Sequence, residues 1–330
     1  MISLRGNAAF LRGDTLLMFK YLRVSVTDRC NYRCIYCMPE NGICKQPHDQ
    51  IMSYEDMFLV ISAAVETGVE QVRITGGEPL VRAGIVDFIR DLSLIKGLRD
   101  LALTTNGALL GKFAEPLKKA GLNRVNISLD SLNPATFRHI TRIGNLADAL
   151  AGIDAALDAG LRPVKINTVL IPGINDHEIL DFVDFAVNKG LSVRFIERMP
   201  FNSSEADESV RFISQEAVVQ TINTRYRLIH VAEQSFGPST NFVISGTDAR
   251  VGFISSRTVP FCHLCQRLRL TSTGALLPCL DSDYGIDVRG QKKEEIKVTI
   301  ARLYREKMSW NKQRACYAAA FDNSLSKIGG

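Results

Sequence analysis

The chain of 330 residues lacks any hydrophobic run long enough to cross a membrane. No stretch approaches the roughly 18 apolar residues that a transmembrane helix needs. The apolar segment near its start is interrupted by Arg12 and Asp14, so we expect no secretory signal, no membrane partner and a cytoplasmic location. Low-complexity tracts and internal repeats beyond a β/α rhythm are also missing. The composition is 46% hydrophobic and 23% charged, which is typical of a globular protein with a sizeable core.

A strong charge of either sign is missing as well. The formal net charge is +5, which permits an anionic small molecule as ligand but does not demand nucleic acid. We therefore expect no nucleic-acid partner.

Cysteine is too sparse for a disulfide scaffold, because eight residues are spread over a long chain. Six of them nevertheless cluster in two groups, Cys30, Cys34 and Cys37, then Cys262, Cys265 and Cys279. Cys44 and Cys316 stand apart. Clustered cysteines in a chain without a signal indicate metal or iron–sulfur ligands in a reducing compartment.

Short β-rich runs alternate with helical patterns over residues 21 to 200. We predict strands over residues 21–27, 71–75, 100–106, 124–130, 164–170 and 191–197. Helical spacing is clear at Met57, Val60, Ile61, Ala64 and Val65. Ser53 offers that helix a start and Gly68 a stop.

Six strand–helix repeats predict a parallel sheet with right-handed crossovers. Polar residues within or just after the strands favour a partial (β/α)6 barrel of the TIM type over an open sheet, since the carboxyl ends of barrel strands form the active face. These residues are Arg73, Thr75, Thr104, Asn106, Ser128, Asp130, Lys165 and Asn167. After residue 200 the rhythm changes. We predict a barrel over residues 1–200 and a mixed α+β region over 201–330 that carries the second cysteine group.

The first cysteine group, with spacing C-x3-C-x2-C, has three interpretations. The thiols could be buried structural cysteines, which the tight spacing and polar surroundings disfavour. They could form a zinc site completed by Cys44 or His48, because structural zinc takes four ligands. They could instead hold a 4Fe–4S cluster by three thiolates, which leaves one iron open to a substrate.

A second motif bears on this choice. Residues 75–80 read T-G-G-E-P-L, where a strand is expected to end and a helix to begin. The two glycines let a ligand approach the backbone closely, although alone they would suit an ordinary turn. Together with the C-x3-C-x2-C loop, this motif resembles the radical S-adenosylmethionine (SAM) enzymes. The resemblance implies that the cysteine loop holds a cluster, that the G-G-E-P stretch holds the methionine end of SAM, and that the fold is a partial barrel.

The second group follows C-x2-C-x13-C, again three thiolates without an obvious fourth. Zinc is an alternative here too. Arg267 and Arg269 follow at alternate positions, so on a strand both point to one face. They are either a solvated basic edge or a guanidinium pair that binds phosphate or carboxylate.

With T-T-N-G at 104–107, N-I-S-L-D at 126–130 and a terminal Gly329-Gly330, the chain is similar to the GTP 3′,8-cyclase family of molybdenum cofactor biosynthesis. That resemblance implies a 4Fe–4S cluster on each cysteine group. It implies SAM contacts at Tyr36, Gly77, Ser128 and Met199. It implies GTP contacts at Arg23, Arg73, Thr104, Lys165, Arg267 and Arg269.

The implied reaction begins with reductive cleavage of SAM to a 5′-deoxyadenosyl radical, which removes hydrogen from C3′ of GTP. The carbon radical then attacks C8 of guanine. GTP is thus the expected substrate, and an external one-electron reductant and the synthase of cyclic pyranopterin monophosphate are the expected partners. A homodimer is left open. The resemblance also implies that the Gly-Gly tail enters the barrel mouth and assists SAM cleavage.

Two alternatives use the same cysteines. A radical SAM peptide maturase would also carry auxiliary clusters, but with more cysteines near its C-terminus. A non-catalytic iron–sulfur carrier, or a zinc-stabilised binding module that uses Cys44, would leave the glycine turn and the cationic strand ends unexplained.

Overall fold

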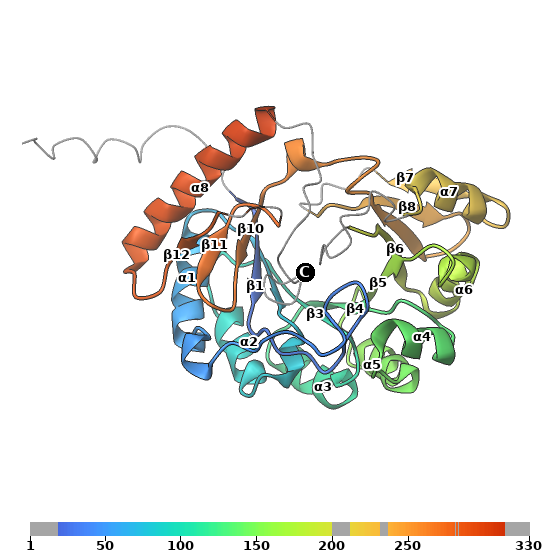
Figure 1. The fold of residues 1–330 in the computed structure, drawn as a ribbon, viewed down its shortest axis with the longest axis horizontal. Helices are drawn as coiled ribbons and strands as arrows, with labels where there is room; N and C mark the ends of the chain where they lie inside the picture. Colours follow the sequence, from blue (N-terminus) through green and yellow to red (C-terminus); the bar gives the residue numbers. More distant parts are fainter. Residues whose placement is uncertain (1–18, 200–211, 232–236, 281, 283, 314–330) are drawn as a thin grey trace, which may run out of the picture.

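A computed structural model describes residues 19–199, 212–231, 237–280, 282 and 284–313. These residues form one twelve-stranded sheet with the order β12-β11-β10-β1-β2-β3-β4-β5-β6-β9-β8-β7. The sheet curves into an arc, and helices cover its outer side (Figure 1). The first eighteen residues, Cys316 and the Gly-Gly tail lie outside the described part of the chain.

The six predicted strands are confirmed as neighbours in a parallel sheet. They are β1 Tyr21–Ser25, β2 Gln71–Thr75, β3 Asp100–Thr105, β4 Arg124–Ser128, β5 Lys165–Leu170 and β6 Ser192–Glu197. Only β2 has the predicted bounds. The others are one or two residues shorter. Strands β1, β3 and β4 end earlier, because the chain there already enters the loops of the active face, whereas β5 and β6 each begin one residue later.

The C-terminal region extends both edges of this sheet. Strand β10 (Arg267–Leu270) pairs parallel to β1, and β9 (Arg250–Ile254) pairs parallel to β6. Antiparallel strands follow on the outside: β11 Ala275–Leu277, β12 Ile286–Asp287, β8 Thr240–Ile244 and β7 Leu228–Val231. Among the described strands β7 and β12 are not paired to each other, so the barrel stays open. The predicted partial barrel is confirmed.

The helices lie between the strands in sequence and outside the sheet in space (Figure 1). They are α1 Tyr54–Glu66, α2 Ile85–Ser93, α3 Leu110–Lys119, α4 Pro134–Thr141, α5 Leu146–Asp158, α6 Ile179–Lys189, α7 Gln215–Asn223 and α8 Lys293–Gln313. Ser53 caps α1 by accepting a hydrogen bond from the Asp56 amide, as predicted. None of the described helices is long and apolar enough to span a membrane.

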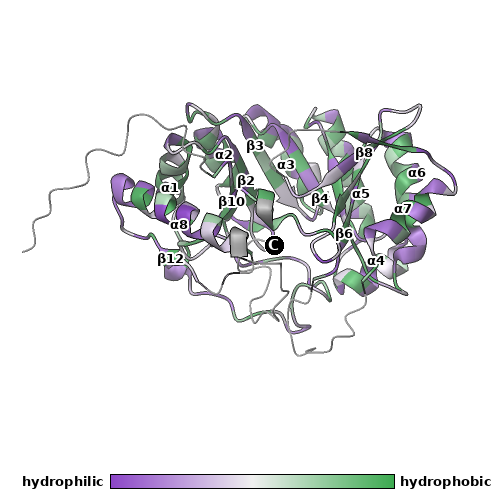
Figure 2. Ribbon diagram, turned by 90° about the horizontal axis from the view of Figure 1, so that it is seen from above, coloured by the Kyte–Doolittle hydropathy of each residue, from purple (hydrophilic) through white to green (hydrophobic). Residues whose placement is uncertain are grey.

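The two faces of the central strands differ in chemistry. In β2, Val72 and Ile74 are fully buried in the hydrophobic core, whereas Arg73 and Thr75 line a cavity inside the arc. The same alternation holds along the neighbouring strands, because successive side chains of a strand point to opposite faces. Seen from above, hydrophobic residues are prominent on the strands and hydrophilic ones on the outer helices (Figure 2). The sheet therefore packs an apolar outer face on its helices and keeps a polar inner face.

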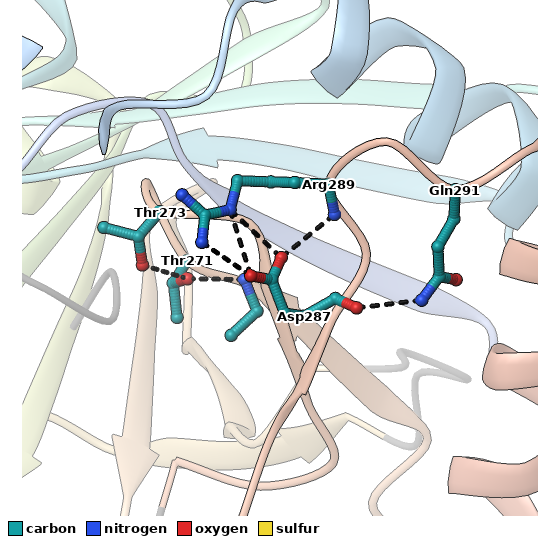
Figure 3. Close-up of polar contacts among 6 residues, drawn as sticks. Thr271, Thr273, Asp287, Arg289 and Gln291 are labelled. Carbon is teal, nitrogen blue, oxygen red and sulfur yellow. Dashed lines mark hydrogen bonds and ion pairs between the residues drawn. The ribbon is translucent and has the colours of Figure 1, made fainter. Parts of the chain in front are cut away.

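Side-chain contacts surround the turns that connect β10, β11, β12 and α8 (Figure 3). The Asp287 carboxylate accepts hydrogen bonds from the Arg289 amide at 3.0 Å and from its guanidinium Nη2 at 2.6 Å. The Gln291 side-chain amide donates to the Asp287 carbonyl, and the Ala275 amide donates to the Thr271 hydroxyl. These bonds shape the two turns of this region, one between β10 and β11 and one between β12 and α8.

Candidate functional site

A cavity of about 470 Å³ occupies the inside of the barrel. The first cysteine loop lines one part of it, and inward-facing side chains of β1 to β6 and β10 line the rest. The predicted residues at its wall are Cys30, Cys34, Cys37, Tyr36, Gly77, Ser128, Met199, Arg23, Arg73, Thr104, Lys165 and Arg267. Twelve of the sixteen predicted site residues thus meet at one place.

The cysteine loop is held against the end of α4. The amides of Arg33 and Ile35 donate to the carbonyls of Thr141 and Ile140, at 3.1 and 2.9 Å. Arg142, which follows α4 with a positive φ of 63°, donates from its guanidinium to the carbonyls of Arg33 and Met38. Because the loop has little regular structure of its own, these contacts set its course.

The glycine turn supports the loop from the other side. The Gly77 amide donates to the Thr27 carbonyl at 2.7 Å, and the Glu78 amide donates to the Arg29 carbonyl at 2.8 Å. A Cβ atom on Gly77 would lie 2.3 Å from the Arg29 carbonyl oxygen, closer than any real contact. Gly77 is therefore required first for packing against the chain that enters Cys30, a reason that the motif alone did not reveal.

The Glu78 carboxylate ties this turn to the end of β3. It accepts hydrogen bonds from the Asn106 amide at 2.7 Å, from the Thr105 hydroxyl at 2.8 Å and from the Leu80 amide at 3.0 Å. Burial raises the pKa of Glu78 to about 7, although these three donors oppose the shift. Glu78 thus joins the end of β3 through its carboxylate and the cysteine loop through its backbone amide.

The chemistry of the first three cysteines fits a metal cluster. Burial raises the pKa of Cys30 to about 11 and holds the pKa of Cys34 well above its usual value. These thiols would be protonated without a metal, and they would ionise when iron binds, because a metal deprotonates a coordinating thiol. Among the described residues, no three Cys, His, Asp or Glu side chains are arranged to hold a single metal ion.

Tyr36 and Asp130 form a buried pair beside the cysteines. The Tyr36 hydroxyl donates to the Asp130 carboxylate at 2.6 Å, and the Val169 amide donates to the same carboxylate at 2.8 Å. Burial raises the pKa of Asp130 to about 6, and both donors oppose that shift. The pair fixes the aromatic ring between Cys34 and Cys37 against the barrel wall.

Cations dominate the wall of the cavity. Among its described lining residues are seven basic side chains: Arg23, Arg73, Arg124, Lys165, Arg194, Arg198 and Arg267. The lining carboxylates are Asp100 and Glu197. Asp100 already accepts from Arg124 at 2.9 Å, and Glu197 accepts from two loop amides at 2.8 and 3.1 Å. The cavity therefore has a surplus of positive charge.

This surplus shifts the pKa values of the cations themselves. Burial lowers the pKa of Lys165 to about 6, and repulsion by Arg194, Arg124 and Arg73 adds to the shift. Burial likewise lowers the pKa of Arg194 to about 9. Burying like charges close together costs free energy, so an anionic ligand in the cavity would offset the cost of burying these cations.

Unpaired polar atoms point to the same kind of ligand. Arg73 Nε, Thr104 Oγ1, Asn126 Nδ2 and Asn167 Oδ1 are buried and have no hydrogen-bond partner within the described part of the chain. Buried polar atoms are rarely left unpaired in proteins. Donors and acceptors are mixed among these four, which suits a ligand with both phosphate and base or sugar groups.

The second cysteine group lies beside the cavity. Cys262 opens the short 3-10 helix Cys262–Leu264, Cys265 leads into β10, and Cys279 follows β11. Phe261, Arg267 and Leu280 next to them line the cavity, but these cysteines do not. Burial raises the pKa of the Cys265 thiol, but the charges of Arg267 and Lys307 outweigh it and lower the pKa to about 6. A thiolate is thus favoured here even before a metal binds.

Comparisons with known proteins agree with this geometry. Residues 24–186 match the Radical SAM superfamily, and residues 191–317 match Molybdenum Cofactor Synthesis C. The chain is 48% identical to a GTP 3′,8-cyclase of Petrotoga mobilis over 82% of its own length and 84% of that protein. It is 45% identical to a GTP 3′,8-cyclase of Geobacter sulfurreducens over 94% of its own length and 96% of that protein.

The chain belongs to the GTP 3′,8-cyclase family. The predicted family resemblance is thus confirmed. Among solved structures, it resembles Streptococcus suis SuiB bound to the precursor peptide SuiA, with a TM-score of 0.65 and 15% identity over 94% of this chain and 70% of that one. At this identity the likeness concerns the fold alone, and it agrees with the partial barrel.

Four predicted residues of this family member are not at the cavity wall. Arg269 is buried on β10, in register with Arg23 of β1, and Cys262, Cys265 and Cys279 are not among the lining residues. Arg267 and Arg269 lie on one strand as predicted. Arg267 also contacts the ring of Phe261 at 5.0 Å and donates to Cys265 Sγ at 3.4 Å.

The sequence interpretation missed several residues of the site. Arg124 and Arg194 line the cavity, and both stand in predicted strands where an isolated cation interrupts an apolar run. That signal had identified Arg73 and Lys165. Lys307 was also missed, although it follows Ile300 and Leu303 at helical spacing on the buried face of α8.

Proposed function

We infer that this protein catalyses the radical SAM cyclisation of GTP to 3′,8-cyclo-7,8-dihydroguanosine 5′-triphosphate, the first step of molybdenum cofactor biosynthesis. The observation that carries this inference is the 45% identity to a GTP 3′,8-cyclase over 94% of the chain. It agrees with a cationic cavity that lies beside two cysteine groups. When bound, the first 4Fe–4S cluster would supply the electron that cleaves SAM, SAM would supply the 5′-deoxyadenosyl radical that removes hydrogen from C3′ of GTP, and the second cluster would bind the guanine.

The chain's own residues would orient the nucleotide. We propose that Arg23, Arg73 and Lys165 hold the triphosphate, since guanidinium groups suit phosphate oxygens and the lumen has surplus positive charge. Thr104 has an unpaired hydroxyl at the same wall. Arg267 and Arg269 would bind the part of GTP nearest the second cluster, held by Cys262, Cys265 and Cys279.

The residues near the first cluster would orient SAM. Cys30, Cys34 and Cys37 would leave one iron open to it. Tyr36, Gly77, Ser128 and Met199 line the same cavity as these cysteines. The buried Tyr36–Asp130 pair keeps one wall fixed, which favours a single orientation of the reacting groups.

The partners follow from the reaction. We propose an external one-electron reductant, a cytoplasmic location suited to unoxidised thiols, and a functional link to the enzyme that makes cyclic pyranopterin monophosphate. A homodimer remains compatible with this proposal.

The decisive experiment uses the anaerobically reconstituted protein with GTP, SAM and a strong reductant. We expect about eight irons per chain from two four-iron clusters, together with formation of methionine, 5′-deoxyadenosine and the cyclised nucleotide. Replacing Cys30, Cys34 or Cys37 by Ala should abolish SAM cleavage, whereas Cys44→Ala should retain it. Zinc in place of iron, or SAM cleavage that never depends on GTP, would count against the proposed function.

A further inference from the structure

Lys307 is a buried cation placed against the second cysteine group. It lies on α8, where its side chain is only 2% exposed. Its ammonium group donates to Cys265 Sγ at 3.2 Å, to the Arg267 carbonyl at 2.7 Å and to the Pro278 carbonyl at 2.8 Å. An ammonium has three donors, so all its protons are used in these bonds.

The three acceptors belong to both segments that supply cysteines. Cys265 and Arg267 lie where the chain enters β10, and Pro278 immediately precedes Cys279. One side chain therefore fixes the separation of the two segments, which are apart in sequence. The Phe19 ring lies 5.5 Å from the ammonium, and α8 itself packs on α1. The clamp is thus held from outside the cysteine segments.

We propose that Lys307 is a positioning residue for the second iron–sulfur cluster, which sets the geometry of its cysteine ligands and raises its reduction potential. Hydrogen bonds to ligand sulfur and a nearby positive charge stabilise the more negative, reduced cluster. This role rests on the proposed function, because it requires that the cysteine group holds a cluster. Lys307 touches neither GTP nor SAM in this proposal.

The test compares Lys307→Met and Lys307→Gln with the unaltered protein. Met keeps about the length of the lysine side chain but removes its charge and its hydrogen-bond donors. Gln removes the charge and keeps two donors, so it serves as the second variant if Lys307→Met does not fold. Arg305→Met is the matched control, because Arg305 is an exposed cation one half-turn away on α8. Each anaerobically reconstituted protein is titrated with reductant and followed by electron paramagnetic resonance. The first cluster is recognised by the change of its signal on addition of SAM.

We expect the reduced-to-oxidised ratio of the second cluster at fixed potential to fall at least tenfold in Lys307→Met, which is about 59 mV for a one-electron couple. The ratio in Lys307→Gln should lie between those of Lys307→Met and the unaltered protein. The potential of the first cluster should not change in any variant, and Arg305→Met should change neither cluster. Loss of iron from the second site alone in Lys307→Met would also support the positioning role. Unchanged iron and unchanged potential in both Lys307 variants would overturn it. An unaltered protein that binds no second cluster would instead overturn the proposed function.

Discussion

At the scale of single residues, the site depends on close approach at Gly77. We expect Gly77→Ala to displace the chain at Thr27–Arg29, because the new methyl group would overlap the Arg29 carbonyl and overpacking of a rigid contact costs about 1–3 kcal/mol. The first cluster should then assemble poorly, and iron should fall from about eight toward about four per chain. Gly111→Ala on α3 is the control, since no atom lies within 4 Å of its Cβ position. Full iron in Gly77→Ala would contradict this explanation.

Lys165 makes nucleotide binding depend on pH. Its pKa in the empty protein is lowered to about 6, first by burial and then by the neighbouring arginines, so at pH 7.5 it is mostly neutral. A bound triphosphate restores its charge, and binding should therefore take up close to one proton. GTP affinity should fall as pH rises above about 6, by up to tenfold per pH unit.

Calorimetry of GTP binding without SAM, in two buffers of different ionisation enthalpy, measures this proton uptake. It should disappear in Lys165→Met and persist in Lys119→Met, because Lys119 is an exposed partner of Glu115. Equal uptake in all three proteins would assign the proton to another group.

The cations show how far single residues could be predicted from sequence. Arg73 and Lys165 stand out in the sequence as cations within predicted strands, and the structure brings both to the cavity. Arg124 and Arg194 carry the same signal and could have been found by it. Lys307 follows Ile300 and Leu303 at helical spacing, so its burial could also have been predicted. Its bonds to Cys265 and to the Pro278 carbonyl could not, because those segments are distant in sequence.

At the scale of elements, the barrel strands were predictable and their C-terminal neighbours were not. Strand β2 and helix α1 follow directly from alternation, helical spacing and the Ser53 cap. The C-terminal strands β10 and β9 pair with β1 and β6 across long stretches of sequence. Local patterns do not encode such pairing, which explains why the region after residue 200 could only be described as mixed.

Helix α8 stabilises the region of the second cysteine group through its apolar face. Leu303 on this face is fully buried, so Leu303→Ala should lower the free energy of unfolding by about 2–5 kcal/mol. Val298 lies on the same helix but is 68% exposed, and Val298→Ala should have little effect. Urea unfolding of the metal-free protein measures both. Similar midpoints for the two variants would mean that α8 does not anchor the sheet edge.

At the scale of the whole molecule, the barrel gathers more positive than negative charge around one cavity. Seven basic side chains and two already engaged carboxylates line it. Crowding buried charges of one sign lowers stability, and a ligand that binds only the folded state raises it. Stability should thus depend on polyanions in solution even when no reaction takes place.

Inorganic tripolyphosphate provides a test that is independent of the radical chemistry. At about one hundred times its dissociation constant, it should stabilise the folded protein by about 2.7 kcal/mol, a rise in melting temperature on the order of 4 °C. Chloride at matched ionic strength should not reproduce this rise, because screening lacks the geometry of bound phosphates. Replacing Arg73 and Lys165 together by Met should remove most of it, since the lumen then loses two of its cations. If tripolyphosphate stabilised the double variant as much as the unaltered protein, the polyanion would bind outside the cavity. The cations of the cavity would then be explained by another ligand.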